Sequence, residues 1–262
     1  MGEAIVVTSG KGGVGKTTTT ANIGVALASM QKRVALVDTD IGLRNLDVVL
    51  GLENRIIFDI THVAHQECDV RTALIKDKRY PNLQLLAASQ TRDKEDVKPH
   101  DVELIIKELT KEFDYVLIDC PAGIDRGFRN ATAGVSKALV VTTPEIPSIR
   151  DADRAIGLLE EMHIQPWVII NKIRPGMIKS GDMLDLQSIM DVLMAELIGL
   201  VPDDDAIISS TNKMAPAIAR NPSSNAAKAY RNIARRVQGE QIPFMEIKPL
   251  PLLARLRRAL SG

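Results

Sequence analysis

Short apolar runs alternate with longer amphipathic stretches along most of this 262-residue chain. The runs are rich in Val, Ile and Leu, as buried strands are, and cover residues 4–8, 33–37, 83–87, 115–118, 138–142, 167–170 and 197–201. Four stretches instead carry apolar side chains at helical spacing, over residues 17–30, 102–112, 148–162 and 185–196. This alternation predicts an α/β fold in which helices cover both faces of a mostly parallel sheet.

Composition limits the number of domains and the class of partner. The chain is 45% hydrophobic, and no repeat or low-complexity linker divides it, so we expect one domain over residues 1–245 and a short tail over residues 246–262. Lys and Arg total 33, as do Asp and Glu, so no overall field attracts nucleic acid or membrane. Only two cysteines occur, which favours a reducing cytoplasm over a disulfide scaffold.

A glycine-rich octet lies between the first predicted strand and the first predicted helix. It consists of Gly10, Lys11, Gly12, Gly13, Val14, Gly15, Lys16 and Thr17. Glycines allow successive backbone N–H groups to converge on phosphate oxygens at the positive end of the helix. Lys16 adds a full charge for the outer phosphates, and Thr17 offers a hydroxyl to Mg²⁺. The strand, loop and helix together predict a phosphate-binding loop for a nucleotide with Mg²⁺.

Acidic residues follow two other predicted strands. Asp119 closes the run 115–118, where a phosphate loop requires a second metal-side acid from a neighbouring strand. Asp38 and Asp40 follow the run 33–37, and alternation along an extended chain places both on one face. One of these two carboxylates is suited to steer metal-bound water, and the other to orient the attacking water.

Two weaker features concern the base of the nucleotide. Asn171 and Lys172 end the sixth predicted strand, and Asn171 is a candidate for the base pocket. GTPases with a similar pair carry an aspartate two residues later, which accepts hydrogen bonds from guanine, whereas this chain has Arg174, which offers no acceptor. ATP is therefore favoured over GTP, and by analogy Pro202 packs on the adenine.

The block from Lys11 to Thr18 resembles the loop of the deviant Walker A (MinD/ParA) family of ATPases, which includes the nitrogenase iron protein. Further blocks narrow the resemblance to the ATPases that select the division site in bacteria, over essentially the whole chain. These blocks are residues 41–47, 89–94, 121–124 and 144–153. The resemblance implies a P-loop ATPase domain that binds ATP with Mg²⁺ and forms an ATP-dependent homodimer.

The resemblance also implies a role for each candidate residue. Lys11 reaches across the dimer to the partner's phosphates, Asp38 and Asp119 support the metal together with Thr17, and Asp40 positions the hydrolytic water. Arg44, Asn45, Asp151 and Asp153 lie near the dimer interface and serve partner contacts, the alternative being ordinary polar surface residues. A MinC-like division inhibitor is the expected partner, and a MinE-like regulator is a second candidate.

The C-terminal tail has a pattern of its own. At about 100° per residue, its leucines fall within one arc and its arginines on the opposite side. The leucines are Leu252, Leu253, Leu256 and Leu260, and the arginines are Arg255, Arg257 and Arg258. This pattern predicts a short helix on an anionic membrane surface, so that the protein is cytoplasmic and peripheral on the inner face of the cell membrane. A helix docked on the protein's own surface or in a coiled-coil-like contact is the alternative.

Two other functional classes stay open. A ParA-like ATPase of DNA segregation would bind nucleic acid, but zero net charge and the leucine-arginine tail speak against it, so we expect no nucleic-acid partner. A metal-cluster carrier would need paired cysteines. His62, His65 and Cys68 recur at every third residue, a spacing typical of one helix surface.

Overall fold

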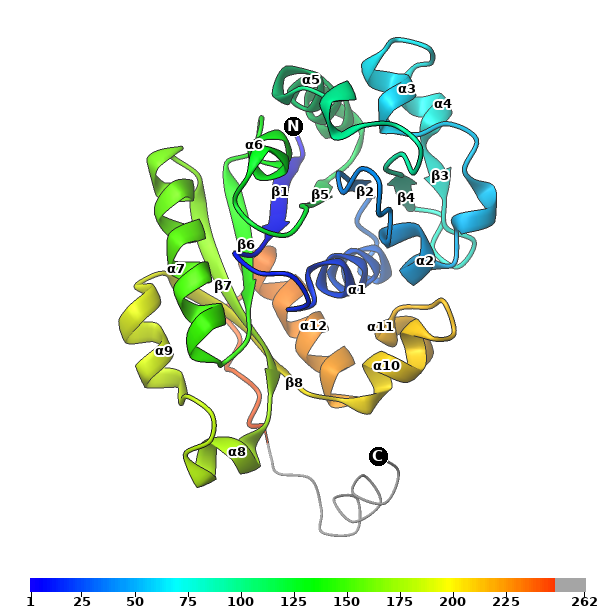
Figure 1. Ribbon diagram of the computed structural model, residues 1–262. Helices are drawn as coiled ribbons and strands as arrows, with labels where there is room; N and C mark the ends of the chain where they lie inside the picture. Colours follow the sequence, from blue (N-terminus) through cyan, green and yellow to red (C-terminus); the bar gives the residue numbers. More distant parts are fainter. Residues whose placement is uncertain (248–262) are drawn as a thin grey trace.

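The computed structural model describes residues 1–247, and in them eight strands form one sheet in the order β3-β4-β2-β5-β1-β6-β7-β8 (Figure 1). The strands are β1 (Glu3–Thr8), β2 (Val34–Asp38), β3 (Ile75–Lys76), β4 (Leu83–Leu86), β5 (Tyr115–Asp119), β6 (Lys137–Thr142), β7 (Gln165–Ile173) and β8 (Glu196–Pro202). All neighbouring strands pair in parallel, except that β3 runs antiparallel to β4. The predicted α/β fold with a mostly parallel sheet is confirmed.

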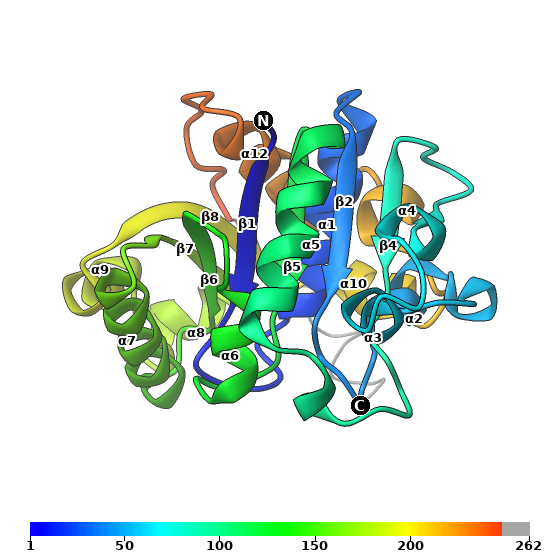
Figure 2. The same ribbon diagram turned by 90° about the horizontal axis from the view of Figure 1, so that it is seen from above.

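Helices cover both faces of this sheet (Figure 2). They are α1 (Lys16–Ser29), α2 (Leu46–Leu50), α3 (Ile60–Ala64), α4 (Val70–Ala73), α5 (Pro99–Glu112), α6 (Arg126–Ala131), α7 (Ile146–Glu161), α8 (Pro175–Ser180), α9 (Leu186–Leu193), α10 (Asp205–Thr211), α11 (Ala217–Arg220) and α12 (Asn225–Val237), with 3₁₀ turns η1 (Glu53–Arg55) and η2 (Lys94–Asp96). The side chains of α1 and α12 pack in one apolar layer, and those of α5 and α7 in the other.

The central strand β1 shows why two layers form. Ile5 and Val7 belong to the layer of α1, whereas Ala4 and Val6 belong to the layer of α5. Successive side chains of a strand point to opposite faces, so an unbroken apolar run fills both layers at once. The sheet therefore lies between two cores, and polar groups gather where the strands end.

Several elements differ from the sequence-based expectation, among them α12, a helix of 13 residues that was not predicted. The edge strand β3 was not predicted, because its two residues carry no periodicity. The helix expected over residues 185–196 ends at Leu193, since Met194 adopts a left-handed conformation with φ 46° and Glu196 already begins β8.

The predicted membrane-facing residues, Leu252, Leu253, Arg255, Leu256, Arg257, Arg258 and Leu260, lie outside the described residues. Among residues 1–247, no helix is both long and apolar enough to cross a membrane.

The single tryptophan of the chain, Trp167, lies near the amino end of β7, at the opposite end of the strands from the glycine-rich octet. It is 8% exposed, its Nε1 donates to Glu196 Oε2 at 2.8 Å, and Lys137 Nζ lies 4.5 Å from the ring centre. Polar side chains therefore contact the aromatic ring at this end of the sheet.

Candidate nucleotide site

The glycine-rich octet forms the turn from β1 into α1. Gly13 and Gly15 have φ of 77° and 100°, a left-handed region that favours glycine. Gly15 is the N-cap of α1, a helix of 14 residues, so the N–H groups of its first turn are exposed to an anion at the loop. The local geometry is that of a phosphate-binding loop.

Close approach requires two of the glycines. A Cβ on Gly15 would lie 2.5 Å from Asn171 Nδ2, and a Cβ on Gly10 would lie 2.0 Å from the carbonyl oxygen of Asp151 in α7. Gly13 has no atom within 4 Å of such a Cβ. The loop is therefore packed between β7 and α7 at two points, and its middle is open.

The two lysines of the loop differ in exposure. Lys16 is 8% exposed, and its Nζ donates to Ser9 Oγ at 3.0 Å, while Ser9 Oγ donates to the carbonyl oxygen of Lys11 at 2.7 Å. The side chain of Lys11 is exposed. Lys16 is thus held against its own loop, whereas Lys11 extends from the surface.

Asp38 and Asp119 lie directly opposite each other at the ends of β2 and β5. Burial, with the neighbouring charge of Asp119, raises the pKa of Asp38 from 3.8 to about 8. Burial also raises the pKa of Asp119 from 3.8 to about 6, although hydrogen bonds from Thr17 and Thr20 and the charge of Lys16 favour its ionised form. Two buried acids with a hydroxyl beside them form an oxygen donor set that fits Mg²⁺.

Backbone N–H groups fix the Asp38 carboxylate. Its Oδ1 accepts from the N–H of Asp40 at 2.9 Å, and its Oδ2 accepts from the N–H of Leu46 at 3.2 Å. The carbonyl oxygen of Asp40 in turn accepts from the N–H of Arg44 at 3.0 Å. Asp40 is partly buried in this turn, at the same edge as Asp38 and Asp119.

The structure gives Arg44 an internal partner. Its Nε lies 2.9 Å from Oδ2 of Asp47, which is fully buried, and its backbone is left-handed with φ 45°. Burial raises the pKa of Asp47, and the charge of Arg44 offsets part of that shift. Asn45, which precedes α2, is exposed.

Asn171 and Lys172 hold the loop from β7. Asn171 Nδ2 donates to the carbonyl oxygen of Val14 at 2.8 Å, and Lys172 Nζ donates to that of Gly13 at 2.8 Å. Lys172 reaches the loop from a left-handed backbone with φ 57°. This clamp was not predicted, although an Asn-Lys pair at a strand end was the available signal. The base contact predicted for Asn171 stays a prediction, as does that of Pro202, which is buried at the end of β8.

The remaining predicted residues lie on α7. Asp151 is partly buried, and its backbone contacts Gly10, whereas Asp153 is exposed. The structure therefore brings Asp151 to the loop and leaves Asp153 on the surface.

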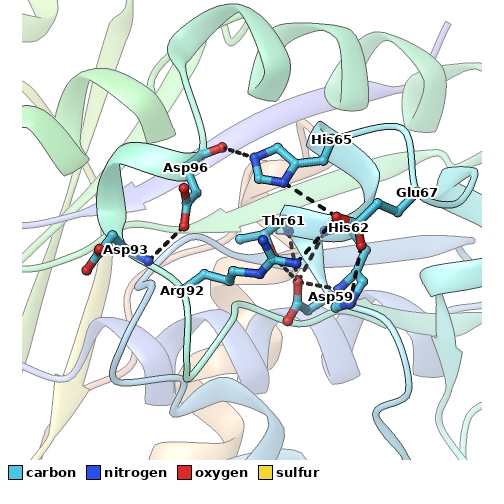
Figure 3. A network of polar contacts seen from close by, with 8 residues as sticks. All are labelled: Asp59, Thr61, His62, His65, Glu67, Arg92, Asp93 and Asp96. Atoms are coloured by element: carbon cyan, nitrogen blue, oxygen red, sulfur yellow. Dashed lines mark hydrogen bonds and ion pairs between the residues drawn. The ribbon is translucent and has the colours of Figure 1, made fainter.

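A polar network connects α3 with the segment that follows β4 (Figure 3). Asp59 caps α3 and bonds to His62 Nδ1 at 2.9 Å, and Arg92 pairs with Glu67 at 3.3 Å. His65 Nε2 lies 3.1 Å from the carbonyl oxygen of Asp96. His65 and the Arg92–Glu67 pair therefore tie the segment after β4 to the end of α3, whereas His62 bonds within the α3 region.

Comparisons with known proteins agree with this geometry. The ParA family model, described as NUBPL iron-transfer P-loop NTPase, matches residues 1–238. The septum site-determining protein MinD of Bacillus subtilis is 55% identical, over 95% of this chain and 93% of its own length. The chain belongs to the MinD family. The resemblance inferred from the sequence is therefore confirmed.

Solved MinD structures share the fold. MinD in the MinC:MinD cell division complex of Aquifex aeolicus has a TM-score of 0.86 and 46% identity, covering 93% of this chain and 98% of that one. MinD of Pyrococcus horikoshii, solved with Mg-ADP, has a TM-score of 0.83 and 30% identity, covering 90% and 96%. As a member of the MinD family, the chain is a P-loop ATPase of cell division.

Proposed function

We propose that this chain is an ATP-driven switch that places the division site. It binds ATP with Mg²⁺, forms a homodimer, attaches peripherally to the inner face of the cell membrane through residues 246–262, recruits a MinC-like inhibitor, and leaves after hydrolysis. Residues 1–245 form the ATPase domain. The observation that carries the proposal is the buried pair of Asp38 and Asp119 at the carboxyl edge of the sheet, next to Lys16 at the start of α1.

Each loop residue has a role that its geometry supports. The backbone N–H groups from Gly10 to Thr18 and the Lys16 ammonium bind the phosphates, and Thr17, Asp38 and Asp119 hold the metal. Bound Mg²⁺ neutralises charge on the phosphate oxygens. Asp40 orients the water, since its backbone is tied to Asp38 at the same edge.

Pairing of two subunits would use the exposed residues around the loop. Lys11 extends from the surface and adds its charge to the partner's phosphates, as an arginine finger does. Asn45 and Asp153 are exposed, and we assign them to contacts with a second subunit or an inhibitor, together with Arg44 and Asp151. The solved MinC:MinD complex supports a MinC-like partner, and a MinE-like protein is the candidate regulator.

ATP is the preferred nucleotide in this proposal. Arg174 takes the place of the guanine-binding aspartate, and its side chain forms an ion pair with Asp203. Asn171 lies near the carboxyl end of β7 and Pro202 ends β8, and we assign both to the adenine.

Free-energy magnitudes explain why the switch would need two copies. Each arginine near an anionic leaflet contributes about 1 kcal/mol, and a buried leucine about 1.5–3 kcal/mol, before the cost of ordering the segment. One tail therefore binds marginally. Two tails on one dimer gain from effective concentration, by on the order of 10²-fold or more.

The test is co-sedimentation of the full chain with vesicles made of equal parts phosphatidylglycerol and phosphatidylethanolamine. We expect binding with ATP, little binding with ADP, and none for a chain ending at Ile247. Equal binding with ADP and with a non-hydrolysable ATP analogue would refute the cycle. A parallel arm with duplex DNA tests the ParA-like alternative, which predicts ATP-dependent binding that weakens steeply with salt.

A further inference from the structure

An apolar groove opens between β7, β8, α8 and α9, apart from the phosphate loop. Its volume is about 380 Å³, within the range of about 300–1,000 Å³ typical of ligand pockets. Among the described residues, Lys179 is the one charged residue of the lining. The other lining residues are apolar: Pro144, Ile170, Ile173, Pro175, Ile178, Leu184, Leu186, Ile189, Leu200, Met245 and Ile247. A concave lining of apolar side chains with one charged group is typical of a binding pocket.

The chain itself leads into this groove. After α12, residues 240–244 lie near Glu196 at the amino end of β8. The next residues of the chain run to the groove, where Met245 and Ile247 form part of the lining (Figure 1). Ile247, the last described residue, lines the groove, so the tail starts at its wall.

The tail fits the groove in reach and in chemistry. Leu252 and Leu253 follow Ile247 by five and six residues, and an extended chain covers about 3.3–3.6 Å per residue, so both leucines lie within reach of the groove that Ile247 lines. Asp182 and Asp185 are exposed on either side of Leu184 and provide negative charge for the tail's arginines. A tether this short holds the leucines at an effective concentration on the order of millimolar.

We propose that, in the absence of membrane, the groove binds the leucine face of residues 250–260 of the same chain. The inference rests on the proposed membrane function of the tail and adds a means of regulating it, since docking in the groove competes with lipid binding. The leucines that enter lipid are the ones that enter the groove, so the two states exclude each other. The apparent affinity of a single subunit for lipid is therefore its intrinsic affinity multiplied by the fraction of time that the tail is undocked.

A cysteine pair tests the docking without lipid. The variant carries Leu186→Cys and Leu253→Cys, with Cys68→Ser to remove the partly buried native thiol. Cys120 is buried, and burial raises its pKa to about 12, so it does not compete for oxidation. The matched control replaces Leu186→Cys by Val192→Cys, on the same helix but outside the groove lining.

We expect the Leu186→Cys pair to oxidise about 10-fold faster than the Val192→Cys pair in ADP without vesicles, because docking raises the local thiol concentration. Equal rates for the two pairs would overturn the proposal. Docking that is seen while the unaltered chain never binds vesicles would refute the membrane function and leave the groove contact standing.

A second measurement uses lipid. Leu186→Ser makes the groove wall polar, and we expect it to raise vesicle affinity in ADP by about 10-fold if the tail is docked about nine-tenths of the time. Val192→Ser, at a position that is 48% exposed, should leave the affinity unchanged. An unchanged affinity in Leu186→Ser, with a melting temperature like that of the control, would contradict the proposal.

Discussion

The carboxyl edge of the sheet has a polar half and an apolar half. Around β1, β2 and β5, the chain buries Lys16, Asp38 and Asp119 at the strand ends. Around β6, β7 and β8, the same edge carries Pro144, Ile173 and Leu200 along an apolar groove. Both halves follow apolar strands of similar composition, so the difference lies in the few residues that come after each strand.

The comparison shows two ways of preparing a site. The polar half retains carboxylates whose pKa values are raised by burial, so this arrangement opposes folding until a cation neutralises the charge. The apolar half leaves hydrocarbon accessible to water, which favours any apolar segment that covers it. The polar half therefore favours a cationic ligand, and the apolar half favours a hydrocarbon surface that fits the groove.

The largest expected effect is on the polar half. Lys16→Ala removes the buried ammonium beside the loop, and we expect ATP hydrolysis to fall by about 10²–10³-fold, the range seen when one charge-stabilising donor is lost. Phosphate release measures it. Lys179→Ala, at the exposed rim of the apolar half, is the control and should hydrolyse ATP at the normal rate; a similar loss there would contradict the division of roles.

The second prediction concerns pH without Mg²⁺. The pKa of Asp38 is about 8 in the folded protein against 3.8 ordinarily, so between these values the folded state binds more protons than the unfolded state, and stability falls as pH rises. Asp38→Asn removes this slope and should leave the variant relatively more stable near pH 8, by on the order of 2–4 kcal/mol.

Thermal melting at several pH values, with and without Mg²⁺, checks this prediction. Added Mg²⁺ should restore the stability of the unaltered chain at high pH, because the metal binds the ionised carboxylates of the folded state. Parallel pH slopes for the two proteins would rule out Asp38 as the source.

The third prediction compares two glycines of the loop. Gly15→Ala places a Cβ 2.5 Å from Asn171 Nδ2 at a left-handed residue, so we expect a loss of about 3 kcal/mol in the free energy of unfolding. Gly13→Ala has the same backbone cost without the clash and should lose about 1–2 kcal/mol. Urea unfolding measures both losses. Equal losses would show that the Asn171 side chain moves away from the new methyl group without a measurable cost.

The smallest effect belongs to an exposed ion pair within the apolar half. Arg174 pairs with Asp203 between the ends of β7 and β8, but the arginine side chain is 53% exposed. Arg174→Ala should therefore change the free energy of unfolding by less than about 1 kcal/mol. A larger loss in urea unfolding would mean that this pair holds the ends of β7 and β8 together.

The sequence predicted the polar half better than the apolar half. Asp38 and Asp119 stand directly after apolar runs, and Lys16 stands within the glycine-rich octet, so all three are visible in a single sequence. The groove has no such signal, because its lining comes from separate strands, helices and the segment before the tail, and each leucine in it resembles a core residue.

Some site contacts also depend on backbone conformations that a sequence pattern does not contain. Lys172 reaches Gly13 from a left-handed residue, and Arg44 reaches the buried Asp47 from another. Lysine and arginine rarely adopt this conformation, so propensity gives no reason to expect either contact. Asp204, by contrast, is of a residue type that favours helix N-caps, and its side chain accepts from the N–H of Ala206 at the start of α10.

Trp167 gives the molecule a built-in optical reporter. It is the only indole in the chain, it is buried, and it lies at the far end of the strands from the phosphate loop. Intrinsic fluorescence will therefore register global unfolding while remaining insensitive to nucleotide. Trp167 can therefore report unfolding in the same way with and without bound nucleotide.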